Sequence, residues 1–259
     1  MTIDSRPSGG SRRLALISDI HGNLPALEGV LADIDSRGGV DLIYHIGDLV
    51  GYGASPNEVV ALLHDRGIAG VAGNYDSTVA LDYIHCGCRY ENPLQEAQAH
   101  ESFEWTRANV TPETKRRLAQ LPFRVDVRPF GGHLSGPMVT LIHGAATLNT
   151  LYWTADRTDT FCREMAERIR AKAGDVIAFG HTHLSWHRTI DGIDFVNAGS
   201  VGRPKDGDPR AGYVVMTMSP GLPATVEFRR IDYDVERAAT SILATSLPAA
   251  FAEFLRRGG

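Results

Sequence analysis

The sequence is poor in cysteine and has no long apolar run. Its three cysteines, Cys86, Cys88 and Cys162, do not make a disulfide framework, so we expect free thiols in a reducing compartment. For Cys86 and Cys88, a redox pair or a metal clip is the alternative interpretation. No stretch approaches the roughly 18 apolar residues of a membrane span. These features exclude a disulfide-rich secreted scaffold and a protein that crosses a bilayer.

An excess of positive charge is also missing. The net charge is −5, whereas a surface that binds nucleic acid needs basic residues to release counterions from phosphates. Residues 1–13 are rich in Ser, Gly and Arg and lack the apolar run of a signal peptide, so we interpret them as a flexible tail. We therefore expect a cytoplasmic protein that binds neither nucleic acid nor membrane, and we leave the oligomeric state open.

What the sequence does contain is a series of five short polar motifs. They are Asp19-Ile20-His21, Gly47-Asp48, Gly73-Asn74-Tyr75-Asp76, His143-Gly144 and Gly180-His181-Thr182-His183. The motifs supply imidazole, carboxylate and amide donors but no thiolate, a set that suits Mn, Fe, Zn, Ni or Co in an accessible site. Seven candidate ligands are too many for one four- to six-coordinate ion, so we expect two. Two ions roughly 3.5–4 Å apart stabilise the attacking and leaving oxygens of a displacement at phosphorus.

Each motif follows a short apolar run that is typical of a buried strand. The runs cover residues 14–18, 42–46, 68–72, 139–142 and 176–179. In open α/β sheets, active sites collect at the carboxyl ends of the strands. We therefore expect the candidate ligands to meet at one sheet edge.

The remaining patterns predict helices and two more strands within a single domain over residues 14–259. A helical stripe covers residues 24–37, and Ser55-Pro56-Asn57-Glu58 is a typical helix start. Residues 92–109 and 111–121 form a helical pair inserted within residues 78–122, a candidate lid over the site. Residues 195–197 and 213–218 are predicted as strands. The segment 235–259 is predicted to be helical, with an interruption at Pro248.

At these motifs the chain strongly resembles the calcineurin-like metallophosphoesterase superfamily, from Leu14 to about Tyr233. The segment 47–53 with the following Ser-Pro-Asn-Glu is similar to a small bacterial branch described as diadenosine-tetraphosphatase-like or as phosphodiesterases. The resemblance implies a four-layer α/β/β/α sandwich. It also implies two divalent transition-metal ions, with Mn²⁺ the first expectation and Fe, Zn, Ni or Co as alternatives.

The resemblance also implies a role for individual residues. Asp19, His21 and His183 would bind the first metal, Asp48 would bridge both metals, and Asn74, His143 and His181 would complete the second site. Asp48, Asn74, His143 and Tyr75 are the residues expected to take part in catalysis. Residues 197–202 resemble the family's Asn-Pro-Gly-Ser segment, with Ala198 where proline is usual. On this basis Ser200 and Arg203 are expected to contact substrate, although Arg203 and Lys205 could instead be solvated charges.

The chain departs from the family at two positions. Many members have His directly after the Asn ligand, as a proposed general acid, where this chain has Tyr75. A phenol with a pKa near 10 matches neutral pH less well than an imidazole near 6.5. The second departure is the segment Val50-Gly51-Tyr52-Gly53, which replaces the Asp-Arg-Gly of protein phosphatases and symmetric diadenosine tetraphosphatases. Without that phosphate-clamping Arg, both activities are disfavoured.

The function expected from the sequence is hydrolysis of a phosphodiester, phosphomonoester or phosphoanhydride in a small, soluble, nucleotide-like substrate. The nucleophile would be a hydroxide that bridges the two metals. The alternatives are a non-catalytic metal-binding scaffold of the same fold and a protein phosphatase. Scaffolds of this fold usually lose ligands, whereas every ligand position is filled here.

Overall fold

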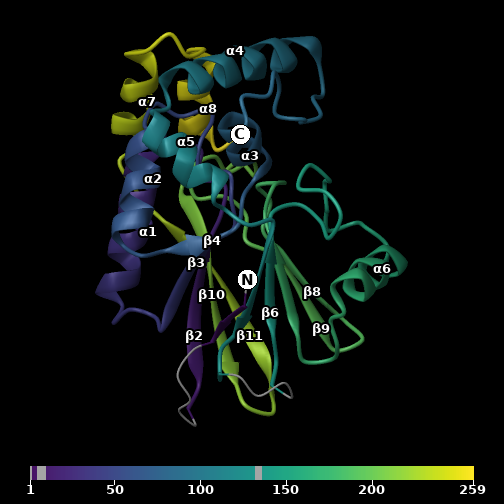
Figure 1. Ribbon diagram of the computed structural model, residues 1–259. Coiled ribbons are helices and arrows are strands. Elements are labelled where there is room, and N and C mark those ends of the chain that lie inside the picture. Colours follow the sequence, from purple (N-terminus) through teal and green to yellow (C-terminus); the bar gives the residue numbers. More distant parts are fainter. Residues whose placement is uncertain (1, 5–9, 132–135) are drawn as a thin grey trace.

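In the computed structural model, which describes residues 2–4, 10–131 and 136–259, two β-sheets pack face to face (Figure 1). The five-stranded sheet has the order β11-β10-β2-β3-β4. Its strands are β2 (Arg12–Ile17), β3 (Leu42–His45), β4 (Ala69–Gly70), β10 (Ala211–Ser219) and β11 (Leu222–Ile231). The six-stranded sheet has the order β1-β5-β6-β7-β9-β8. It comprises β1 (Thr2–Asp4), β5 (Arg124–Arg128), β6 (Val139–Ile142), β7 (Val176–Phe179), β8 (Trp186–Ile190) and β9 (Ile193–Asn197).

Helices cover the outer face of each sheet and one end of both. α1 (Leu24–Ser36) and α2 (Pro56–Asp65) lie on one outer side, and α6 (Asp159–Ile169) lies on the other (Figure 1). The remaining helices gather at the end where the motifs lie. They are α3 (Asn74–Ala80), α4 (Pro93–Asn109), α5 (Pro112–Ala119), α7 (Val235–Leu243) and α8 (Ala250–Arg257). No helix within the described ranges is both long enough and apolar enough to cross a membrane.

The layers follow from the two-residue alternation of side chains along a strand. In β7, Val176 and Ala178 belong to the core between the sheets, while Ile177 and Phe179 pack with the residues of α6. In β2, Leu16 faces the inter-sheet core and Ile17 packs with the residues of α1 and α2. Strands buried on both faces need continuous apolar runs, which is what the sequence has at these places. The predicted four-layer α/β/β/α sandwich is confirmed.

The direction of the strands brings the motifs together. β2, β3 and β4 are mutually parallel, and so are β6, β7 and β9. The loops that follow β2, β3, β4, β6 and β7 carry the five motifs, and they converge at the edge covered by α3, α4 and α8 (Figure 1).

Several local features differ from the sequence-based expectation, and the strands β5, β8 and β11 and the helix α6 were not predicted. Thr2–Asp4 form β1, paired in parallel with β5, and Arg12 already belongs to β2, so these parts of the expected tail are regular strand. Residues 1 and 5–9 of that tail lie outside the described residues. The helix α3 was not anticipated, since its residues were seen as a ligand-bearing loop. The inserted pair and the C-terminal segment are helical as expected, at α4, α5, α7 and α8.

Candidate metal centre

Six of the seven candidate ligands form two buried groups at the shared sheet edge. Within each group the donor atoms lie within 4.8 Å of one another. The first group is Asp19, His21 and His183, and the second is Asp48, His143 and His181. All six side chains are buried.

Asp48 lies between the two groups. Its Oδ2 is 3.3 Å from Nε2 of His143 and 3.7 Å from Nε2 of His21, which belongs to the other group. Its Oδ1 accepts a hydrogen bond from the backbone N–H of Tyr75 at 2.9 Å. One oxygen therefore faces both groups while the other fixes the carboxylate to the start of α3.

Backbone carbonyls orient three of the imidazoles. Nδ1 of His21 donates to the carbonyl of Val50 at 3.0 Å, and Nδ1 of His143 donates to that of Ile46 at 2.7 Å. Nδ1 of His183 donates to the carbonyl of Arg203. When Nδ1 carries the proton, Nε2 of a neutral imidazole is left with a lone pair for a metal.

These lone pairs face one another, which is the clearest sign of missing positive charge. Nε2 of His21 lies 3.1 Å from Nε2 of His183, and the latter lies 3.2 Å from Oδ1 of Asp19. Oδ1 of Asp19, Oδ1 of Asn74 and Nε2 of His181 are buried without a hydrogen-bond partner. Buried acceptors are normally satisfied. Oxygen and imidazole nitrogen acceptors of this kind are ligands for divalent ions, so the donor set fits one cation held by each group.

The protonation states agree with this interpretation. Burial lowers the pKa of His21 to about 3, although the nearby carboxylate of Asp48 acts to raise it. Burial also lowers the pKa of His181 to about 3. Both imidazoles are therefore neutral near pH 7. Burial also acts on the pKa of His143, but the Asp48 carboxylate outweighs it and raises that pKa to about 10. In the metal-free protein, a proton on His143 takes the place of a cation beside Asp48.

The backbone at the ligands is held in an unfavourable conformation. Five ligands have a positive φ, at 51° for Asp19, 49° for His21, 51° for Asp48, 66° for His181 and 63° for His183. Such conformations cost of order 1–3 kcal/mol each in non-glycine residues and persist where the surrounding structure imposes them. Hydrogen bonds between the loops do so here, from the N–H of Asp19 to the carbonyl of Gly47 at 3.0 Å and from the N–H of His21 to that of Asp48 at 3.0 Å.

The seventh candidate ligand, Asn74, is oriented by the cysteine loop. Its Nδ2 donates to the carbonyl of Cys86 at 3.1 Å and to Sγ of Cys88 at 3.2 Å, which leaves Oδ1 as the free acceptor. The structure joins Cys86 and Cys88 in a disulfide, which corrects the expectation of free thiols for these two residues. Two cysteines separated by one residue in a tight loop are close enough to pair. Cys162, a buried residue of α6, has a free thiol, as expected.

Two polar residues that support the ligands were not identified from the sequence. The buried carboxylate of Asp76 accepts from the N–H of Leu49 at 2.8 Å and from the N–H of Gly73 at 2.9 Å, so it ties the Asp48 loop to the Asn74 loop. The hydroxyl of Ser18 donates to Oδ2 of Asp19 at 2.6 Å. Asp76 belongs to the motif Gly73-Asn74-Tyr75-Asp76, but its role depends on its place in the first turn of α3, a helix that the sequence patterns did not predict.

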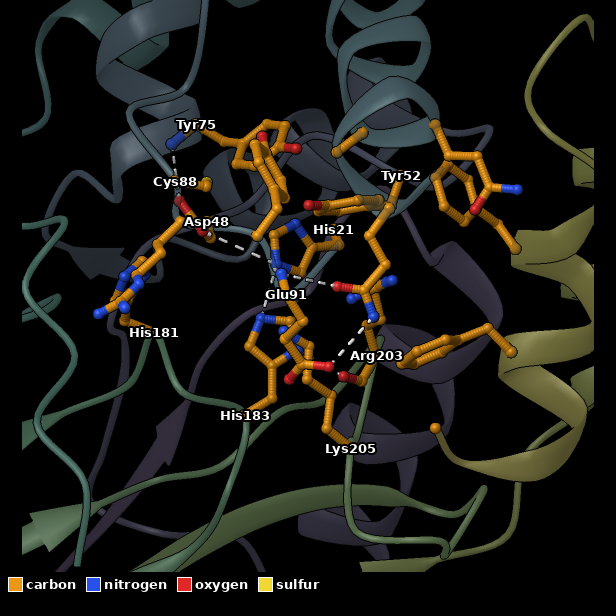
Figure 2. A pocket seen from close by; sticks show the side chains of 18 of the residues that line it. His21, Asp48, Tyr52, Tyr75, Cys88, Glu91, His181, His183, Arg203 and Lys205 are labelled. Atoms are coloured by element: carbon orange, nitrogen blue, oxygen red, sulfur yellow. Dashed lines mark hydrogen bonds and ion pairs between the residues drawn. The ribbon is translucent and has the colours of Figure 1, made fainter. Parts of the chain in front are cut away.

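A pocket of about 390 Å³ opens over the two groups (Figure 2). Its floor includes ligands from both groups, and its walls come from the cysteine loop, α4, the loop after β9 and α8. The lining residues outside the ligand set include Tyr52, Tyr75, Cys88, Arg89, Tyr90, Glu91, Gln95, Tyr152, Arg203, Lys205, Phe251 and Phe254. The inserted helix α4 therefore does border the site, and so does the C-terminal helix α8.

Tyr75 lies on the pocket wall and is almost fully enclosed. Its ring packs against Gly51, where a Cβ would collide with it and where φ is +94°. The phenol oxygen is buried without a hydrogen-bond partner, and burial raises the pKa of Tyr75 well above 10. The hydroxyl is therefore a protonated donor at neutral pH.

The two expected substrate contacts, Ser200 and Arg203, occupy different environments. Ser200 is buried outside the pocket lining, and its hydroxyl donates to the carbonyl of Asp19 at 2.7 Å and accepts from the N–H of Arg203 at 2.7 Å. Ser200 therefore differs from its expected role, because its hydroxyl is used to tie two loops. Arg203 lines the pocket.

Comparison with known proteins agrees with the motifs. The model of the calcineurin-like phosphoesterase superfamily domain matches residues 13–221. An uncharacterised protein of Methanocaldococcus jannaschii is 30% identical, over 95% of this chain and 98% of its own length. A crystal structure of a metallophosphoesterase from Sphaerobacter thermophilus is 26% identical with a TM-score of 0.71, covering 96% of this chain and 100% of the other. A hypothetical protein of Pyrococcus horikoshii shares the fold, with a TM-score of 0.79 at 18% identity over 95% and 98% of the two chains.

Proposed function

Because this chain belongs to the calcineurin-like phosphoesterase superfamily and is thus a metal-dependent phosphoesterase, we propose that it hydrolyses a small, nucleotide-like substrate at a two-metal centre. The observation that carries the proposal is the pair of buried candidate ligand groups, in which Oδ1 of Asp19 and Nε2 of His181 have no hydrogen-bond partner. Two divalent ions, Mn²⁺ in the first instance, would occupy the two groups. Bound there, such ions supply a hydroxide nucleophile near neutral pH and positive charge for the phosphoryl oxygens.

In this proposal the residues of the chain have separate tasks. Asp48 faces both groups and would be the shared ligand. His143 and His181, with Asn74, would hold the second ion, and Asp19, His21 and His183 the first. Tyr75 keeps its proton at neutral pH, so it would donate a hydrogen bond to an oxygen of the substrate without transferring the proton.

The pocket supports a small substrate. A volume of about 390 Å³ falls within the range of small-molecule sites, roughly 300–1,000 Å³. Aromatic rings line it together with three cationic residues, Arg89, Arg203 and Lys205. Such a lining suits a compact anionic substrate with a flat group, and we propose neither nucleic acid nor membrane as a partner.

The test is turnover of bis-p-nitrophenyl phosphate by the protein after EDTA treatment and dialysis, with and without added Mn²⁺. We expect turnover that depends on the metal and that the Asp48→Asn variant lacks. A non-catalytic scaffold would bind two equivalents of Mn²⁺ and release no p-nitrophenolate under any of these conditions. That outcome would overturn the proposal.

A further inference from the structure

Arg203 is a buried cation without a carboxylate partner. Its exposed fraction is 9%, and among the described residues no Asp or Glu forms an ion pair with it. Its guanidinium carbon lies 4.1 Å from the ring centre of Tyr52 and 3.9 Å from that of Phe254. Contact with two aromatic faces offsets part of the free energy that is needed to bury the charge. The rings do not accept hydrogen bonds from the guanidinium N–H groups, however.

The position of Arg203 is fixed relative to the ligand groups. Its backbone carbonyl accepts the proton on Nδ1 of His183, and its backbone N–H donates to Ser200, which in turn donates to Asp19. Two of these three hydrogen bonds use the backbone of Arg203 and none uses its side chain, so its guanidinium N–H groups remain available to a ligand. The residue is therefore placed by the same contacts that place two candidate ligands.

The ring of Tyr52 separates the guanidinium from the ligands. Tyr52 contacts Arg203 at 4.1 Å on its face and the ring of His21 at 5.0 Å, with the His21 and Tyr52 planes at 84°. Arg203 is thus one aromatic ring away from the candidate metal centre, in the same pocket. A group held by the guanidinium would lie beside the reacting phosphorus rather than at it.

Lys205 adds a second cation to this wall. It lines the pocket and its side chain is exposed to solvent. Glu91 also lines the pocket, where its carboxylate accepts a hydrogen bond from the side chain of Gln95 at 3.4 Å and its negative charge favours the protonated form of Lys205 (Figure 2). The wall therefore carries positive charge that the described residues do not neutralise by an ion pair.

We propose that Arg203 and Lys205 form a second anion subsite, which takes the phosphate next to the one that reacts. The favoured substrate then contains a phosphoanhydride, as in a nucleoside diphosphate or triphosphate, and the second phosphate is the leaving group. This inference rests on the proposed function, because the subsite is defined relative to the reacting phosphorus.

The chemistry of such a substrate fits the absence of a strong general acid. The hydroxide oxygen forms a bond to phosphorus, the bond from that phosphorus to the bridging oxygen breaks, and the electron pair stays on the departing phosphate. The hydroxide proton is released to solvent from the phosphate product. Arg203 neutralises the charge that develops on the departing group, so no proton has to be transferred to it, and a Tyr at position 75 is sufficient.

The experiment compares substrates with one and two phosphates across matched variants. kcat and KM are measured with Mn²⁺ for ADP, AMP and bis-p-nitrophenyl phosphate, using the wild type, Arg203→Gln, Arg203→Lys and Lys205→Gln. Arg66→Gln is the control for loss of a charge, since Arg66 pairs with Asp35 outside the pocket. Isothermal titration with α,β-methylene-ADP and with AMP gives a second readout that does not depend on turnover.

We expect the wild type to have a higher kcat/KM for ADP than for AMP. Arg203→Gln should lower kcat/KM for ADP roughly 10- to 100-fold more than for the diester. This is the range expected when a hydrogen bond to a charged group is lost. Arg203→Lys should recover part of the loss, and the binding advantage of methylene-ADP over AMP should disappear in Arg203→Gln. If Arg203→Gln fails to fold, Lys205→Gln must show the same selective loss.

Failure of the inference and failure of the proposed function would give different results. Hydrolysis of the diester with equal losses for ADP and diester in the variants would overturn the subsite and leave the phosphoesterase intact. AMP turned over as well as ADP by the wild type would do the same. If the wild type with Mn²⁺ hydrolyses none of the three substrates, the proposed function itself is refuted.

Discussion

Oδ1 of Asp48 accepts a hydrogen bond from the backbone N–H of Tyr75 at 2.9 Å, so the carboxylate that faces both ligand groups is fixed by the first turn of α3. The same contact places the phenol of Tyr75 beside the pocket. The position of the Asp48 carboxylate and the position of the side chain at residue 75 are therefore linked through the backbone of α3.

Asp48→Asn should abolish turnover and lower the occupancy of both metals, because one carboxylate faces both groups and an amide is a weaker, neutral ligand. Elemental analysis after dialysis against metal-free buffer measures the occupancy, with the wild type as control. Two retained equivalents of metal together with normal turnover would refute the bridging role.

His181→Ala should remove mainly the second metal, and His183→Ala mainly the first. The two residues stand in one motif but belong to different groups, with His183 3.2 Å from Asp19. Anomalous scattering from crystals of each variant shows which peak fades. Loss of the same peak in both variants would rule out this division of the motif.

Removal of the metals should lower the free energy of unfolding, because the facing lone pairs at His21 and His183 are left without a cation. An ion present at 100 times its Kd stabilises the folded protein by about 2.7 kcal/mol per site. Thermal unfolding with EDTA and with increasing Mn²⁺ measures the effect. A Tm that does not change with Mn²⁺ would argue against a site in the folded protein.

Tyr75→His should help substrates with poor leaving groups selectively, by up to about 10²-fold, since an imidazole near pKa 6.5 can transfer a proton at neutral pH. Tyr75→Phe should cost little with p-nitrophenolate, which leaves without protonation. The measurement is a plot of log rate against leaving-group pKa for the three proteins. Parallel lines of equal slope would mean that residue 75 has no part in proton transfer.

Asp76→Ala should destabilise the protein by about 2–4 kcal/mol, because two buried N–H groups lose their acceptor. Asp76→Asn retains one acceptor and should lose less. Denaturant unfolding of the metal-free proteins measures both variants without a contribution from bound ions. Equal stability of Asp76→Ala and the wild type would exclude the role of Asp76 as a tie between the loops.

The sequence predicted the buried strands and the meeting of the ligand motifs because both depend on local patterns, whereas the four-layer sandwich was what the family resemblance implied. Apolar runs such as residues 176–179 specify buried strands, and parallel strands bring their carboxyl ends to one edge. The inserted helices could be predicted for the same reason, from their caps and periodicity. The roles assigned to individual ligands stay predictions, to be tested by the variants above.

Other features depend on the path of loops or on contacts between distant segments, and the sequence patterns did not predict them. The donation from Asn74 to Cys86 and the disulfide of Cys86 with Cys88 arise from the path of a loop. The motif of residues 197–202 suggested that the hydroxyl of Ser200 contacts substrate. In the structure this hydroxyl forms hydrogen bonds with the backbone of Asp19 and Arg203. The positive φ of Asp19 and His21 results from hydrogen bonds between loops, and local sequence preferences do not predict such bonds.

The aromatic ring that packs on Arg203 from α8 lies outside the segment that the family model matches. Phe254 belongs to α8, beyond residue 221, whereas all seven candidate ligands lie within residues 13–221. One wall of the pocket thus comes from a part of the chain that carries no candidate ligand, although Arg203 and Lys205 lie within the matched segment. An exchange of α7 and α8 between relatives would therefore change the aromatic surface that packs on Arg203 while the candidate ligands stay in place.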